Sequence, residues 1–217
     1  MKHSYTSAKD FQICKSRYAH KYIRKDVKRE STPALEQGVA VHKAFENRLT
    51  AGRAFEGNDA DKHEAFAKAL DGRSLHVELR LGIRADGSPC GSYDEDCWWV
   101  CKIDVVMERP GGCTIFDWKT GKPFEDPFEL RVQAVLLRAH FKYRDINGYY
   151  VWLRENRLGR EHNLNDTART LAEMHAIDDM IKQSEATNFW PEREGPMCNG
   201  YCPVEDCRFY RAPKHLR

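Results

Sequence analysis

The chain lacks the features that mark membrane and secreted proteins. No run of eighteen or more apolar residues occurs in its 217 residues, so we expect no transmembrane helix. The first residues, MKHSYTSAKDFQ, contain no apolar segment of the kind that forms a signal peptide. Hydrophobic residues make up 41% and charged residues 31% of the chain, which suits a folded core with a well-solvated surface. We therefore expect a cytoplasmic protein, in the host-cell cytoplasm if a phage encodes it.

A strong overall charge is also missing. The formal net charge is only +2, so the net charge by itself does not indicate a nucleic-acid partner. The segment 15–29 is nevertheless basic, and tyrosines are interleaved with its cations. Six of its side chains could neutralise phosphates or stack on bases: Lys15, Arg17, Tyr18, Lys21, Tyr22 and Arg24. The alternative is an amphipathic helix with a solvated basic face.

The sequence has no internal repeat and no low-complexity linker, and its hydrophobic periodicity alternates between helix and strand. It predicts helices over 7–25, 34–49, 59–70, 127–141 and 166–185, with Ser7 as a possible cap of the first. It predicts strands over 75–83, 97–107, 113–118 and 148–153. The Pro-Gly-Gly turn at 110–112 should join the second and third strands in a hairpin.

This hairpin carries two acids and a lysine in otherwise apolar surroundings. Asp104 lies in the first strand, and Asp117 and Lys119 lie two residues apart in the second. A strand has a side-chain period of two, so Asp117 and Lys119 share a face, and pairing can bring Asp104 onto it. Two carboxylates can hold Mg²⁺ or Mn²⁺, and the ammonium can stabilise the transition state of phosphodiester hydrolysis. The alternative is an ordinary salt bridge.

Other side chains could belong to the same site. His42 lies on the second helix, four residues from Gly38 and from Glu46, so the three share a helix face. Gly38 would let this helix approach the sheet, and His42 would then reach the metal. Gln133, in the helix after Lys119, could contact substrate or a metal-bound water. Glu78, in the strand before the hairpin, and Glu46 could add carboxylates behind the ligands, although Glu78 is as readily an ordinary strand charge.

The succession of these motifs resembles the RecB-type branch of the PD-(D/E)xK nuclease superfamily. The residues that carry the resemblance are Gly38-x-x-x-His42, Ile103-Asp104, Asp117-Trp118-Lys119-Thr120-Gly121 and Gln133, within roughly residues 34–154. It implies an α/β fold with a central mixed sheet flanked by helices. It also implies a metal held by His42, Asp104, Asp117 and the backbone carbonyl of Trp118, with Lys119 and Gln133 in the catalytic set. Lys102 stands where the family often has glycine, and Leu137 where it often has tyrosine.

The eight cysteines fit a metal centre better than a disulfide framework in a cytoplasmic protein. Cys198, Cys202 and Cys207 supply three thiolates in a segment rich in proline and glycine. The surroundings of Cys14 resemble those of the first cluster ligand in iron–sulfur members of the family, such as the AddB-type and CRISPR-adaptation nucleases. That resemblance implies a 4Fe-4S cluster on these four cysteines. Structural Zn²⁺ is the alternative, and His215 could replace Cys14.

Taken together, the residues and the resemblance predict a Mg²⁺- or Mn²⁺-dependent deoxyribonuclease. We expect an exonuclease on single-stranded or end-bearing DNA that serves recombination, repair or phage DNA processing, on its own or in a recombination or adaptation complex. The alternative is a non-catalytic nucleic-acid-binding module with a structural metal cluster. We expect one nuclease domain over 1–217, with its catalytic core at 34–154. Segments 1–33 and 186–217 would form the cysteine-ligated part, and the other cysteines would be buried or incidental.

Overall fold

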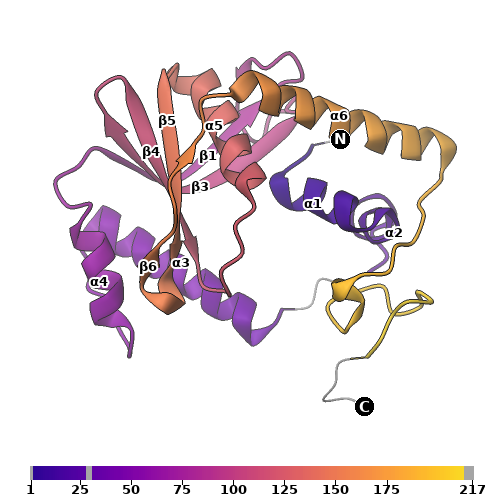
Figure 1. Cartoon of the computed structure of the whole chain (residues 1–217), viewed down its shortest axis with the longest axis horizontal. Coiled ribbons are helices and arrows are strands. Elements are labelled where there is room, and N and C mark those ends of the chain that lie inside the picture. The colour runs from indigo at the N-terminus through magenta and orange to yellow at the C-terminus, as the bar shows by residue number, and fades with distance from the viewer. Residues whose placement is uncertain (1, 28–30, 213–217) are drawn as a thin grey trace. The chain divides into compact units, whose positions relative to one another are not determined.

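A computed structural model describes residues 2–27 and 31–212, so His215 lies outside the described residues. The chain forms two compact units (Figure 1). One consists of Met1–Lys2 and Thr32–Ala172, and we call it the sheet unit. The other consists of His3–Ser31 and Glu173–Arg217, and we call it the cysteine unit.

The sheet unit alternates helices with strands. Its helices are α3 (Pro33–Ala51), α4 (Ala60–Lys68) and α5 (Pro127–Phe141), with the 3-10 turn η2 (Leu153–Glu155). Its longer strands are β1 (Leu75–Ile83), β3 (Trp99–Arg109), β4 (Gly112–Lys119) and β5 (Asp145–Trp152). Three short strands complete it: β2 (Pro89–Cys90), β6 (Arg157–Leu158) and β7 (His162–Asn163). The last helix, α6 (Thr167–Thr187), begins in this unit and continues in the cysteine unit.

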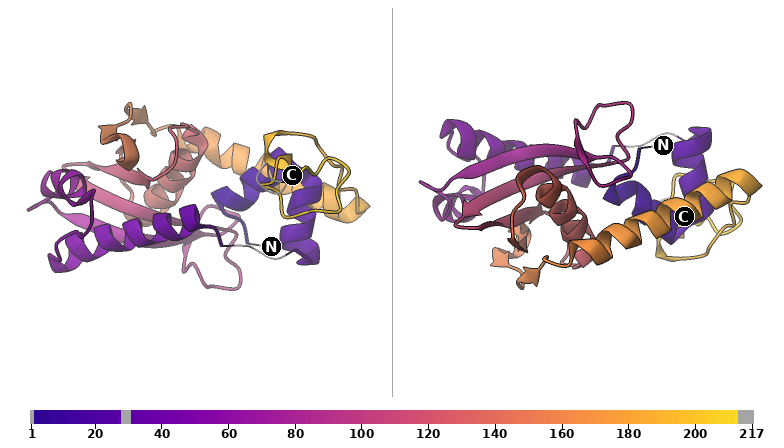
Figure 2. Two further views of the ribbon diagram at one scale, coloured as in Figure 1. Left: turned by 90° about the horizontal axis from the view of Figure 1, so that it is seen from below. Right: turned by 90° about the horizontal axis from the view of Figure 1, so that it is seen from above.

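The seven strands form one mixed sheet in the order β2-β1-β3-β4-β5-β6, with β7 also paired to β5. β1, β3 and β4 are antiparallel neighbours, whereas β4 and β5 run parallel, with α5 as their crossover. Figure 2 shows the sheet between α3 and α5. The expected α/β fold, a central mixed sheet flanked by helices, is therefore confirmed.

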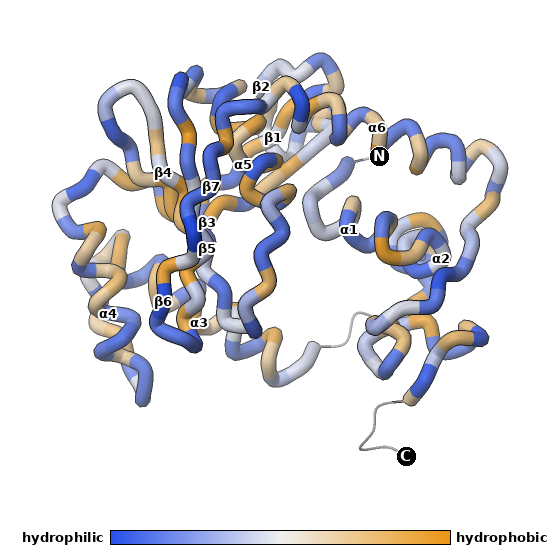
Figure 3. The backbone as a smooth tube through the Cα atoms, viewed as in Figure 1, coloured by the Kyte–Doolittle hydropathy of each residue, from blue (hydrophilic) through white to orange (hydrophobic). Residues whose placement is uncertain are grey.

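Alternation along β4 explains why both faces of the sheet are covered. Trp118 stacks on Phe45 of α3 with ring centroids 4.4 Å apart. Ile115, on the other face, lies with Leu130 of α5 around Gly148, which has no side chain to separate them. Apolar residues accordingly concentrate in the strands of the sheet (Figure 3). The acids of the hairpin are thus held between two apolar layers.

Several expected elements have the predicted bounds. The strand over 75–83 and the helix over 127–141 are observed as β1 and α5, and the hairpin closes at Arg109 and Gly112. The helix expected over 166–185 begins after Asp166, whose side chain accepts the N–H of Arg169. The short strands β2, β6 and β7 were not expected, because two-residue bridges leave no periodicity to detect.

The expected helix over 7–25 is broken in the structure. α1 (Tyr5–Ile13) starts at a capping box in which Ser4 and Ser7 bond each other's backbone, so Ser4 and not Ser7 is the cap. Cys14 then adopts an extended backbone with φ −160°, and a new helix begins as α2 (Lys15–Tyr18) and the π-helix η1 (Ala19–Arg24). The cysteine unit ends with the turn η3 (Pro196–Cys198). Among the described residues, the helices are all too short or too polar to span a membrane.

Candidate functional site

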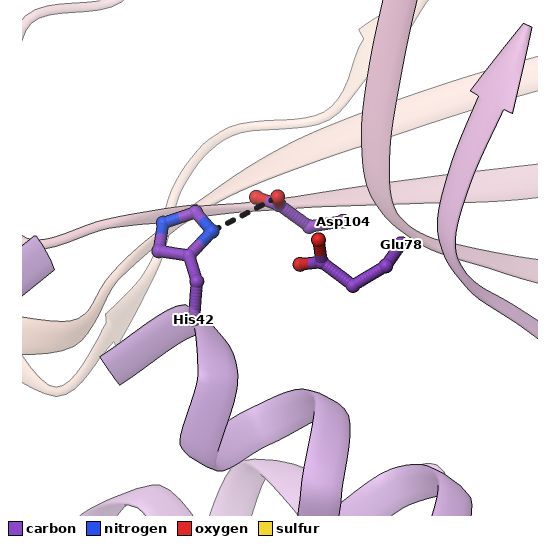
Figure 4. Close-up of side chains that lie close together, drawn as sticks. All are labelled: His42, Glu78 and Asp104. Atoms are coloured by element: carbon purple, nitrogen blue, oxygen red, sulfur yellow. Dashed lines mark hydrogen bonds and ion pairs between the residues drawn. The ribbon is translucent and has the colours of Figure 1, made fainter. Parts of the chain in front are cut away.

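Three side chains from three elements of the sheet unit converge (Figure 4). The β1–β3 register places Glu78 across from Asp104, because the flanking residues on both sides are paired. His42 comes from α3, and its Nδ1 lies 3.0 Å from Asp104 Oδ1. One ligand atom from each of His42, Glu78 and Asp104 lies within 4.8 Å of the other two. An imidazole and two carboxylates at this spacing are the donors that a divalent cation such as Mn²⁺ takes.

Asp104 is fixed by a second contact. Its Oδ2 accepts the backbone N–H of Trp118 at 2.8 Å, at the point where the β3–β4 ladder ends. Burial by itself lowers the pKa of His42, but the hydrogen bond and charge of Asp104 outweigh it and raise the pKa. Asp104 therefore orients His42 and places negative charge beside it.

Glu78 has an unusual backbone. Its φ is +56°, in the left-handed region, although β1 is extended on either side. A non-glycine residue in this region stores strain of about 1 kcal/mol or more, and such strain gathers at functional sites. The Glu78 carboxylate also forms an ion pair with Lys102 of β3.

Asp117 and Lys119 form a second, buried part of the site. Lys119 Nζ lies 2.7 Å from Asp117 Oδ2, and Gln133 Nε2 donates to Asp117 Oδ1 at 3.1 Å. Burial raises the pKa of Asp117, with Lys119 opposing and Asp104 adding to the rise. Burial alone lowers the pKa of Lys119, but Asp117 and Glu129 outweigh it and raise the pKa, so Lys119 stays an ammonium ion.

Glu129 was missed by the sequence analysis. It lies on α5, and its Oε2 is 2.8 Å from Lys119 Nζ. Burial, followed by the charge of Asp117, raises the pKa of Glu129 to about 7. The available signal was its position four residues before Gln133, which places both side chains on one face of α5.

The predicted residues divide between these two parts. Glu78, expected only behind the ligands, stands in the convergent group with His42 and Asp104. Asp117 does not belong to that group, since its carboxylate is held by Lys119 and Gln133. Trp118 contacts the convergent group through its backbone N–H, which donates to Asp104. On α3, Glu46 forms an ion pair with Lys43, and Gly38 lies beside Thr120.

A divalent cation fits the convergent group. The donor atoms of His42, Glu78 and Asp104 already lie close together. The group holds two carboxylates, and Lys102 neutralises only that of Glu78, so negative charge is left for a cation. Gln133 adds an independent observation, because its Oε1 is buried without a hydrogen-bond partner in the described part of the chain. A buried amide oxygen of this kind is costly unless a water or ligand meets it.

The basic segment of the cysteine unit differs from the expectation of a nucleic-acid surface. Tyr18 is 0% exposed and cannot stack on a base in this structure. Arg17, Lys21 and Tyr22 all contact the buried carboxylate of Asp10, Arg17 at 3.0 Å and Tyr22 at 2.8 Å.

Two members of the segment remain. Lys15 donates to Ser184 at 3.2 Å, and Arg24 contacts His20 at 3.0 Å. The expectation is therefore corrected for Tyr18, and each of the other five side chains has a partner within the cysteine unit.

The four cysteines proposed as ligands all belong to the cysteine unit. Burial raises the pKa of Cys202, and interactions with Cys14 and Cys198 raise it further, so both of these sulfurs lie within electrostatic reach of Cys202. Burial likewise raises the pKa of Cys207, with a contribution from Cys14. The other four cysteines, Cys90, Cys97, Cys101 and Cys113, lie on or beside the sheet as free thiols.

Comparisons with known proteins bear on the fold alone. No protein-family model matches the chain, and no curated protein matches it. A crystal structure from Eubacterium rectale, described as that of a "putative exonuclease", aligns with a TM-score of 0.56 at 14% identity. The alignment covers 94% of this chain and 85% of that one, so the two share a fold. The crystal structure of SSO0001 aligns over 97% of this chain and 87% of that one at 13% identity, but its TM-score of 0.47 is too low to establish a common fold.

Proposed function

We propose that the chain is a metal-dependent deoxyribonuclease of the PD-(D/E)xK type, with its active centre on β1, β3, β4, α3 and α5. The observation that carries the proposal is the convergence of His42, Glu78 and Asp104 beside the buried pair of Asp117 and Lys119. The fold shared with the structure described as a "putative exonuclease" supports it.

Each side chain has a defined task in this proposal. His42, Glu78 and Asp104 would hold the cation, and Asp117 beside them would supply a further carboxylate. A divalent ion held by these residues would polarise the phosphodiester and lower the pKa of water at the site. Lys119 remains positively charged beside Asp117 and Glu129 and stabilises the charge that develops on the phosphoryl oxygens.

Two more groups orient these residues. Gln133 fixes the Asp117 carboxylate through its amide N–H, and its unpartnered oxygen is available to the attacking water. Asp104 holds His42 in position through Oδ1 and is itself held by the backbone of Trp118 through Oδ2. We propose single-stranded or end-bearing DNA as the substrate, in recombination, repair or phage DNA processing.

The test is cleavage of labelled DNA by the full chain, purified without oxygen. Linear single- and double-stranded DNA, labelled at either end, and circular single-stranded DNA are incubated with Mg²⁺, Mn²⁺ or EDTA. Lys119→Met is compared with Lys122→Met, an exposed lysine of the following loop. We expect metal-dependent loss of the linear substrates, at least a hundredfold slower in Lys119→Met alone.

Each negative result has its own meaning. Cleavage of circles as fast as linear DNA would replace the exonuclease by an endonuclease. DNA binding without cleavage in either metal would favour the non-catalytic binding module. Absence of both would overturn the proposal.

We propose that the cysteine unit holds a 4Fe-4S cluster on Cys14, Cys198, Cys202 and Cys207. The thiols themselves support it, because all four belong to one unit and Cys14 acts electrostatically on both Cys202 and Cys207, with the Glu192 carboxylate also at Cys207. Four thiolates suit iron–sulfur or zinc. Bound to these residues, the cluster would tie the two ends of the chain together. Iron and labile sulfide assays with visible absorbance separate the alternatives, and one zinc per chain without iron would replace the cluster by Zn²⁺.

A further inference from the structure

Beside the convergent group, the sheet places two cations directly opposite each other. The β1–β3 register pairs Arg80 with Lys102, two residues along each strand from Glu78 and Asp104. Directly opposed side chains of an antiparallel pair share a face, with Cβ atoms about 5 Å apart, and like charges there are destabilising. Two like charges placed in this way repel each other, and an anionic ligand between them would relieve that repulsion.

The two cations differ in what they contact. Lys102 forms its ion pair with Glu78, whose side chain is 11% exposed, while Lys102 itself is 43% exposed. Arg80 is exposed and forms no ion pair within the described part of the chain. One cation is thus paired, but partly exposed, at the edge of the candidate metal group, and the other is open to a ligand.

Glu78 belongs to both arrangements. Its carboxylate is a member of the convergent group, and it is also the counter-charge of Lys102. A cation at His42, Glu78 and Asp104 would repel the ammonium and weaken its hold on that carboxylate. The flexible four-carbon stem of a lysine then allows the ammonium to turn to a nearby anion.

We propose that Arg80 and Lys102 form a binding site for a DNA phosphate next to the one that is cleaved, and that Lys102 moves from Glu78 to this phosphate when a divalent cation binds. The inference rests on the proposed nuclease function and adds to it. No covalent bond changes in this exchange. Its distinguishing consequence is that one lysine opposes metal binding and favours DNA binding.

The experiment measures the two affinities separately. Mn²⁺ binding to the full chain is followed by calorimetry without DNA. Binding of a fluorescent single-stranded oligonucleotide is followed by anisotropy with Mn²⁺ at several salt concentrations, in a Lys119→Met background that leaves the DNA intact. Lys102→Met is compared with Lys62→Met, because Lys62 is also half exposed (49%) and paired with a carboxylate, that of Asp59.

We expect opposite effects on the two ligands. Lys102→Met should bind Mn²⁺ roughly threefold to tenfold more tightly. The same variant should bind the oligonucleotide roughly fivefold more weakly. The slope of its log affinity against log salt concentration should become smaller in magnitude by about 0.7. Arg80→Gln, which breaks no ion pair, should weaken binding of the oligonucleotide and leave Mn²⁺ binding unchanged. Lys62→Met should change neither affinity, and thermal unfolding checks that every variant is folded.

The outcomes separate this inference from the function on which it rests. If the wild type binds Mn²⁺ and cleaves DNA, but Lys102→Met lacks either of its two effects, the inference is overturned and the nuclease proposal stands. If the wild type neither binds Mn²⁺ nor cleaves DNA, both are overturned. Weaker Mn²⁺ binding in Lys102→Met would also overturn it, because Lys102 would then support the metal group.

Discussion

Replacing Glu129 by glutamine should make the stability of the metal-free protein depend less on pH. Glu129 shares the ammonium of Lys119 with Asp117; Asp117 is buried, and Lys119 and Glu129 are partly buried where α5 meets the sheet. Burial, with the repulsion of Asp117, raises the pKa of Glu129 from 4.5 to about 7. The folded protein therefore keeps a proton on Glu129 at pH values where the unfolded chain has lost it.

The sign and size of the effect follow from this difference. The stabilisation from the retained proton is complete below the unfolded pKa of 4.5 and is lost as the pH rises through about 7. A difference of about 2.5 pH units, at about 1.4 kcal/mol each, corresponds to roughly 3–4 kcal/mol. Removing the Glu129 carboxyl also removes its repulsion of the Asp117 carboxylate. We therefore expect the free energy of unfolding of the variant to exceed that of the wild type by about 1–3 kcal/mol between pH 5 and 8.

Urea unfolding followed by circular dichroism, in EDTA at several pH values, measures this gain. Comparison with the wild type at each pH cancels the contributions of the histidines. Glu56→Gln, an exposed loop carboxylate, is the matched control and should leave the pH profile unchanged. The explanation would be refuted if the free energy of unfolding changed with pH in the same way in wild type and Glu129→Gln. It would also be refuted if the variant were less stable than wild type toward pH 8.

Two further substitutions test the metal group and the sheet. Asp104→Asn should abolish Mn²⁺ binding in calorimetry, yet shift the melting temperature only slightly, because the amide oxygen can still accept the N–H of Trp118; retained Mn²⁺ binding would contradict the assignment. Gly82→Ala should lower the free energy of unfolding in urea by about 1–3 kcal/mol, since its Cβ would lie 2.6 Å from Cys97 Sγ, whereas Gly121→Ala meets no atom within 4 Å and should be neutral.

The parts of the site that lie on regular elements could be predicted. A side-chain period of two puts Asp117 and Lys119 on one face, and the structure pairs them at 2.7 Å. The Pro-Gly-Gly turn predicted the hairpin, which is observed. Gln133 was expected near substrate or water; its amide N–H reaches Asp117 on the preceding strand, and its Oε1 has no partner among the described residues, so that expectation stays a prediction.

The basic segment shows where counting charges fails. Its cations outnumber its acids, which suggested a surface for DNA. One buried carboxylate, Asp10 of α1, accepts contacts from Arg17, Lys21 and Tyr22 and turns them toward the protein. A buried charge must be paired, so a single acid outside the segment decides where these cations point. Periodicity does not reveal such a partner.

The backbone of Glu78 is the feature least accessible from sequence, and it yields a sharp prediction. In an ordinary strand, alanine is more stable than glycine by roughly 0.5–1 kcal/mol. At φ +56° the order should reverse, because the left-handed region costs a residue with a Cβ roughly 1–2 kcal/mol and costs glycine little. Both Glu78→Gly and Glu78→Ala lose the carboxylate and the ion pair with Lys102, so their difference isolates the backbone term. We expect Glu78→Gly to be the more stable in urea by about 1 kcal/mol, with Mn²⁺ binding weakened equally in both. A more stable alanine variant would mean that the backbone of Glu78 is not strained. Backbone strain would then play no part in placing the Glu78 carboxylate in the metal group.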